Sequence, residues 1–171
     1  MQAESGPGQD PRGLRLFVLY IASVAVFVWL TSMHLPPLVA SHFGASGAAN
    51  GFMSRTSYLR FTVGFVVGLP AFMVLLTWYA VGSAQARLKL PNQEYWLAPE
   101  RRAGTVAFLR NAILSFGALL VSFLCYAHGL VVLANGLQPP RMSNSWFIGG
   151  LLAYFVVLLV AVRRFLRRFR R

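Results

Sequence analysis

Acidic residues are almost absent from this sequence. Asp and Glu total four against sixteen Lys and Arg, and all charged residues together make up 12% of the 171-residue chain. Soluble domains carry about 25% charged residues, so a soluble fold of this length could not cover its surface with charge. The shortage is explained if lipid, rather than water, surrounds much of the chain.

Motifs that catalysis needs are also missing. The sequence has no GxSxG, phosphate-binding loop or HExxH motif. Its apolar runs have no Asp, Glu, Lys or Arg in their centres, where ion-coupled transporters place such groups. The single cysteine, Cys125, excludes an intramolecular disulfide and a CxxC centre. We therefore expect neither an enzyme nor an ion-coupled transporter, and we expect no cofactor.

What the sequence does have is four long apolar runs, which predict membrane-spanning helices at residues 14–35, 59–82, 108–134 and 146–162. About 20 apolar residues are enough to cross about 30 Å of hydrocarbon. The expected fold class is therefore all-α, an integral membrane four-helix bundle. Residues 1–13 are expected to be disordered. Phe165, Leu166 and Phe169 predict that the last helix continues into the basic tail at 163–171.

Basic residues are distributed unevenly about these spans. Thirteen of the sixteen lie in the N-terminal segment, in the segment between spans two and three, and in the tail. Cytoplasmic segments are enriched in Lys and Arg, so we expect both ends in the cytoplasm and a multi-pass protein of the bacterial cytoplasmic (inner) membrane. A nucleic-acid partner is not expected, because the basic residues flank apolar runs instead of forming one polar face.

The segment between spans one and two is predicted to be an ordered extracytoplasmic loop. Pro37 at a first helical position predicts one short helical turn over residues 38–43, lying on the membrane surface. Gly44, Gly47 and the Asn50-Gly51 pair predict tight turns with positive φ. We interpret the loop either as a packed connector or as a cap that binds a ligand or partner, through Pro37, His42, Phe43, Gly47, Asn50, Gly51 and Phe52.

The same loop has a recognisable pattern, in which a proline is followed by five residues, His42-Phe43, a glycine-rich stretch and Asn50-Gly51-Phe52. This pattern resembles a bacterial domain of unknown function that also forms the N-terminal part of SdpI-type membrane proteins, some of which confer immunity to a secreted toxin. It covers residues 35–55 directly, and about 14–80 with the flanking spans. The later spans of SdpI-type proteins have no counterpart here, so the resemblance implies membership of the group, with immunity or signalling as the kind of role its members have.

The segment 91–102, between spans two and three, also looks like one found in short members of that group. Its Tyr-Trp pair suits the inner headgroup layer, and the following Pro99 suits the start of a helix, whose dipole favours a carboxylate in the first turn. Membrane anchoring explains this segment. The alternatives are an ion pair between its glutamate and an arginine, or a cytoplasmic docking surface made by Tyr95, Trp96, Glu100 and Arg101.

Histidines and the cysteine suggest a further hypothesis. His34, His42, Cys125 and His128 all lie toward the same predicted side of the membrane, and copper or zinc accepts such nitrogen and sulfur ligands. Their spacing is irregular, however, and His128 is equally suited to a hydrogen bond with a neighbouring backbone or side-chain group.

Two further features concern helix packing and lipid. Gly64 and Gly68 have the GxxxG spacing of close helix contacts, inside the bundle or between subunits. Pro70 cannot bond to Val66 and predicts a kink in the second span. The basic tail predicts an anchor on anionic lipid, formed by Arg163, Arg164, Arg167, Arg168, Arg170 and Arg171.

These features predict a small non-enzymatic membrane protein of the SdpI-related group that recognises a peptide, lipid or protein partner through its extracytoplasmic loop. One alternative is an accessory subunit of a larger membrane complex, in a homo- or hetero-oligomer. Another is a metal-handling membrane protein. The bilayer itself, including its anionic lipids, is an expected partner in each case.

Overall fold

The computed structural model describes residues 11–83 and 88–170. Four helical rods within this part are long and apolar enough to cross a membrane, which makes the chain a multi-pass membrane protein. The elements are α1 (Pro11–Met33), β1 (Leu38–Phe43), β2 (Ala49–Ser54), α2 (Arg55–Thr62), the π-helical η1 (Val63–Gly68), α3 (Leu69–Gly82), α4 (Gln93–Trp96), α5 (Pro99–Asn135) and α6 (Asn144–Arg168).

Each predicted span falls on one rod. The second rod consists of α2, η1 and α3 joined end to end, from Arg55 to Gly82. Helix α5 begins at Pro99 with Glu100 in its first turn, as the sequence predicts, and α6 continues past the first tail arginines to Arg168. Of the residues expected to be disordered, 1–10 lie outside the described residues, whereas 11–13 form the first turn of α1.

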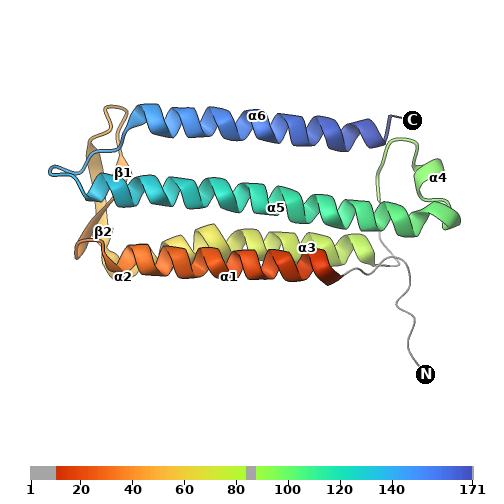
Figure 1. Ribbon diagram of the computed structural model, residues 1–171, viewed down its shortest axis with the longest axis horizontal. Helices are drawn as coiled ribbons and strands as arrows, with labels where there is room; N and C mark the ends of the chain where they lie inside the picture. The colour runs from red at the N-terminus through yellow and green to blue at the C-terminus, as the bar shows by residue number, and fades with distance from the viewer. Residues whose placement is uncertain (1–10, 84–87, 171) are drawn as a thin grey trace, which may run out of the picture.

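The rods lie roughly parallel, with α5 in contact with each of the others (Figure 1). Helix α1 and the α2–η1–α3 rod lie on one side of α5, and α6 lies on the other. The strands cross one end of the bundle, called here the hairpin end. Helix α4, the start of α1 and the close of α6 are at the opposite end, called the α4 end.

The buried core belongs to three of the rods. One cluster joins Val28 of α1, Val66 of η1 and Val121 of α5, and a second joins Phe17 of α1 and Val74 of α3 to α5. By contrast, α6 has no buried residue up to its end at Arg168. Helix α6 is therefore a peripheral rod that packs mainly on α5, with further contacts only near its ends, from Asn144 to the Ala45 carbonyl and from Arg168 to the Trp96 ring.

Proline disturbs the second rod where the sequence predicts a kink. Pro70 lacks the N–H that a regular helix would bond to Val66. The preceding turn, η1, is π-helical, and the Leu69 N–H bonds to the Gly64 carbonyl five residues back.

The GxxxG pair makes no close contact inside the described bundle. A Cβ added at Gly64 would meet nothing within 4 Å, and one at Gly68 would meet only the Val63 carbonyl of its own rod. The prediction of close packing inside the bundle is therefore wrong, and contact between subunits stays a prediction.

Candidate functional site

The segment after Pro37 is a β-hairpin, so the predicted helical turn over residues 38–43 is wrong. Strand β1 pairs antiparallel with β2 (Ala49–Ser54), with Val39 opposite Met53 and Ala40 opposite Phe52. In β1 the adjacent Val39 and Ala40 are both completely buried, Leu38 and His42 are exposed, and the pairing register is irregular between Ala40 and His42. Strand β2 alternates between half-buried and exposed residues from Ala49 to Ser54, as expected of a strand that covers the end of the bundle with one face.

Glycines shape this hairpin at two places. Gly47 has φ +79 in the connecting turn, and a Cβ there would clash with the Met142 carbonyl oxygen. This confirms the prediction of a positive φ at Gly47. The prediction of a turn at Asn50-Gly51 is wrong, because both residues lie within β2. Gly51 instead allows close approach, since its Cβ would lie 2.9 Å from that of His42.

Polar side chains fasten the hairpin to the helices. The Asn135 amide at the end of α5 accepts from the Ala40 N–H (2.8 Å) and donates to the Ala40 carbonyl (2.9 Å). At the C-terminal end of α1, the Nη1 group of Arg55 donates to the carbonyls of Met33, the last residue of the helix, and of Leu35, two residues further on. At the turn, Arg141 donates to the Ser46 carbonyl (3.2 Å), and the Met142 N–H donates to the Gly47 carbonyl (2.8 Å).

The two edges of the hairpin differ. In an antiparallel pair, opposed residues alternate between those that bond each other and those whose N–H and C=O point away from the partner strand. Ala40 is of the second kind, because its N–H and C=O bond to the Asn135 side chain. The N–H and C=O of Phe52 must then point out of the opposite edge, where no described residue bonds to them. The edge of β1 is closed at Ala40, and the edge of β2 is open at Phe52.

The predicted partner-binding residues of this loop therefore divide into two groups. Pro37, His42, Asn50 and Phe52 are exposed, and Phe52 is 51% accessible. Gly47 is buried, and Phe43 and Gly51 are half-buried. The carbonyl of the exposed Pro37 has a structural contact, because it accepts from the Arg55 N–H (2.9 Å).

The four proposed metal ligands do not converge. Among the residues that the structure describes, no group of three or more His, Cys, Asp or Glu side chains could hold a metal ion. Both ring nitrogens of the buried His128 are occupied by protein partners, Nε2 by the Thr31 hydroxyl and Nδ1 by the Tyr58 hydroxyl, each at 2.8 Å. The Nδ1 of His34 is hydrogen-bonded to the carbonyl oxygen of Leu30, one turn earlier in the same segment (2.8 Å). His128 thus bonds neighbouring side chains, which is the alternative that the sequence left open.

At the α4 end, the basic tail docks onto the segment between α3 and α5. Phe169 is 1% exposed and packs edge-on against Trp96, with ring centroids 5.4 Å apart. The Arg168 guanidinium lies 4.4 Å from the centre of the Phe108 ring. The Thr105 hydroxyl donates to the Trp96 carbonyl (2.8 Å), which fixes α4 on α5. Sequence patterns offered no signal for this contact, since 73 positions separate Trp96 from Phe169.

The remaining predicted residues at this end are exposed. Tyr95 lies under the Arg101 guanidinium, 4.1 Å from the ring centre, while Glu100 is exposed and forms no ion pair within the described part of the chain. Five tail arginines are exposed on or just after α6: Arg163, Arg164, Arg167, Arg168 and Arg170. Arg171 lies outside the described residues.

Fold and site together define a class: a helical multi-pass membrane protein with an ordered β-hairpin across one end of its bundle. Comparison with protein-family models, with curated proteins and with solved structures finds no match. Membership of the SdpI-related group therefore stays a prediction from the loop pattern.

Proposed function

We propose that this chain is a non-enzymatic protein of the bacterial inner membrane that binds an extended segment of a peptide or protein partner at the open edge of β2. In this proposal both chain ends are cytoplasmic and the hairpin is outside. The tail and the α4 segment share one end of the bundle, and their arginines match the basic composition of cytoplasmic segments.

One observation carries the proposal: Asn135 closes the edge of β1 at Ala40, whereas at the opposite edge no residue in the described part of the chain bonds to the backbone of Phe52. Exposed strand edges pair readily with a further strand, and natural proteins usually cover or charge them. In recognition by strand addition, main-chain hydrogen bonds supply affinity and alternate side chains supply specificity. The exposed His42, Asn50 and Phe52 are the side chains available to a partner there.

The hairpin is also well prepared for such binding. Its turn and its β1 edge are held by Asn135 and Arg141, so little ordering remains to be done when a partner arrives. The surface is therefore a fixed edge rather than a loop that must fold on binding.

The test is site-specific photocrosslinking in membranes of the native host. A benzophenone amino acid at Phe52 should give an adduct with a peptide or protein partner. The matched position is Leu38, which is 61% exposed and lies on β1. We expect a much weaker adduct there. Equal yields of adduct at Phe52 and Leu38 would show that the partner does not bind preferentially at the β2 edge, and would contradict the proposal.

A second pair of variants separates the backbone from the side chain. Phe52→Pro removes the outward N–H, while Phe52→Ala keeps it and removes the ring. We expect Phe52→Pro to reduce co-purification of the partner by about tenfold relative to Phe52→Ala, the change that loss of about one to two main-chain hydrogen bonds produces. A partner retained equally by both variants would point to side-chain contact without strand addition.

An accessory subunit of a larger complex is the second candidate. It is favoured by the exposed Gly64 and Gly68, where helix backbones could approach closely without a clash. Gly68→Leu should then dissociate the complex on native gels while leaving the Phe52 adduct unchanged. An unaltered complex would argue against this surface.

A further inference from the structure

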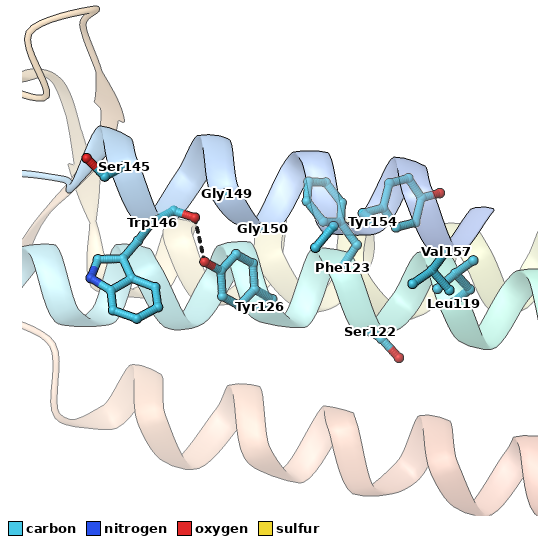
Figure 2. A pocket seen from close by; sticks show the side chains of 11 residues that line it. Leu119, Ser122, Phe123, Tyr126, Ser145, Trp146, Gly149, Gly150, Tyr154 and Val157 are labelled. Atoms are coloured by element: carbon cyan, nitrogen blue, oxygen red, sulfur yellow. Dashed lines mark hydrogen bonds between the residues drawn. The ribbon is translucent and has the colours of Figure 1, made fainter. Parts of the chain in front are cut away.

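A long apolar groove separates α5 from α6 over part of their length. It encloses about 710 Å³ and is lined from Leu119 to Tyr126 on α5 and from Ser145 to Val157 on α6. Figure 2 shows Trp146 and Tyr126 at one end and Val157 and Leu119 at the other. Aromatic rings line the groove, and its polar groups are few.

Small residues on α6 create this hollow. Gly149 and Ala153 both line it, and a Cβ at Gly149 would meet nothing within 4 Å. Gly150 has a different role, because a Cβ there would clash with the Tyr126 ring. That ring seats against the α6 backbone, where its hydroxyl donates to the Trp146 carbonyl (2.6 Å). The contact between Tyr126 and the backbone of α6 therefore fixes the spacing of the two helices at the hairpin end of the groove.

The length of the groove matches one leaflet. Its α6 lining, from Ser145 to Val157, is about 18 Å long at about 1.5 Å per residue. Half of a hydrocarbon core of about 30 Å is about 15 Å. Toward the α4 end, Phe165 of α6 packs on Phe108 and Phe116 of α5 and brings the helices together. A spanning helix needs the full thickness and a width of about 10 Å, so a single lipid chain fits this groove better.

The loop that leads into the groove is suited to a phosphate. Arg141 is the only charged residue between Arg110 and Arg163. With Ser143 and Asn144 it lines a second, more polar pocket of about 320 Å³, immediately before Ser145 and Trp146 along the chain. A guanidinium has five N–H donors, one of which is used here on the Ser46 carbonyl. Charge complementarity thus favours an anionic headgroup at this end.

We propose that the groove between α5 and α6 is a phospholipid site, which holds one acyl chain from the leaflet at the hairpin end and places the lipid phosphate beside Arg141. The site does not depend on which aqueous compartment the hairpin faces, nor on partner binding at β2. The lipid would fill the side of α6 that the protein leaves unpacked and would attach this peripheral helix to the three-rod core.

The test uses phosphatidylglycerol with a diazirine midway along one acyl chain, in vesicles of phosphatidylethanolamine and phosphatidylglycerol containing the purified full-length protein. Adducts should concentrate on groove residues such as Phe123 and Ala153. Gly149→Leu fills the open space and should lower the groove adducts by about tenfold, which corresponds to about 1.4 kcal/mol of lost packing. Ala153→Leu narrows the same groove and should act in the same direction, which covers the case of one variant that fails to fold.

Gly64→Leu is the matched control, because Gly64 has equally open surroundings on a different rod. It should leave the groove adducts unchanged. Adducts spread evenly over the lipid-facing surface, or undiminished in both groove variants, would overturn the proposal. Adducts replaced by contacts between two protein chains along α6 would overturn it in favour of a helix as the occupant.

Arg141→Gln tests the headgroup. It should reduce labelling by the phosphatidylglycerol probe by about tenfold, as expected for loss of one charge-assisted contact, and should not change labelling by a diacylglycerol with the same diazirine chain. Equal loss with both probes would show that Arg141 acts on the fold and would remove the phosphate from the proposal.

Discussion

His128 shows how a residue that suggests chemistry can be structural. Its ring is 3% exposed, lies between Thr31 and Tyr58, and stacks on the Tyr58 ring at 5.8 Å. Three segments far apart in the chain meet there: α1, α2 and α5. A polar group inside a membrane protein is costly unless it is hydrogen-bonded, and here both ring nitrogens are satisfied.

Substitution of His128 should therefore lower stability. We expect His128→Ala to reduce the free energy of unfolding by about 2–3 kcal/mol, because it leaves the Tyr58 hydroxyl buried without its partner and opens a cavity. Tyr58→Phe should cost about 1 kcal/mol. Unfolding in a detergent titration measures both. His42→Ala, at an exposed position, should change the free energy by less than about 0.5 kcal/mol, and an equal effect at His42 would contradict the assignment.

Asn135 is the second residue on which the site depends. Its amide acts toward Ala40 as a neighbouring strand would, with one donor and one acceptor, and also donates to the Val131 carbonyl (2.9 Å). Asn135→Asp keeps the shape and the acceptor but loses the donor. We expect that variant to destabilise the hairpin by about 1–3 kcal/mol, because buried carbonyls lose their partner.

The measurement for Asn135→Asp is hydrogen exchange in the peptide that contains β1. Protection should fall there and remain unchanged in the middle of α5. Loss of protection throughout the molecule would mean that the side chain supports the whole bundle rather than the hairpin.

At the scale of elements, α6 is the weakest attachment in the fold. It has no buried residue before Phe169, and it contacts α5 through rings such as Phe123 with Tyr154, whose centroids are 4.6 Å apart. Phe169 just beyond the helix is the exception, since it is almost fully enclosed by Trp96 and Phe108. Among the described residues, Phe169 is the one buried side chain at this end of the rod, where Arg168 and Phe165 add contacts to the Phe108 ring.

Phe169→Ala should release the tail from α4. Loss of the buried ring removes about 3–5 kcal/mol of packing in a core, and at a helix terminus the simplest response is undocking. Trypsin should then cleave after the tail arginines faster than in the parent protein. Leu166→Ala, at a position 42% exposed, is the matched control and should not change the rate. Unaltered cleavage of Phe169→Ala would show that other contacts hold the tail.

At the scale of the whole molecule, the arrangement of charge sets the expected orientation. The tail, the start of α1 and α4 lie at one end of the bundle, and this end has most of the basic residues. A reporter fused after Arg171 should therefore be active only in the cytoplasm.

The hairpin can be located separately. A thiol-specific reagent that cannot cross membranes should label Asn50→Cys in intact cells, with Cys125 replaced by serine. A reporter active outside the cell would reverse the topology and move the hairpin to the cytoplasm.

The sequence by itself determined the spans, the helix start at Pro99 and the continuation of α6 into the tail. These depend on local properties: the run of apolar residues that lipid solvates, and a proline at a first helical position. Only the tertiary structure decided that residues 38–54 form a hairpin, that His128 is enclosed by hydroxyls, and that Phe169 is buried. Each of these outcomes depends on a partner far away in the chain, namely Asn135, Tyr58 and Trp96. Periodicity along a sequence reports which face is apolar, but it does not report which distant group will meet that face.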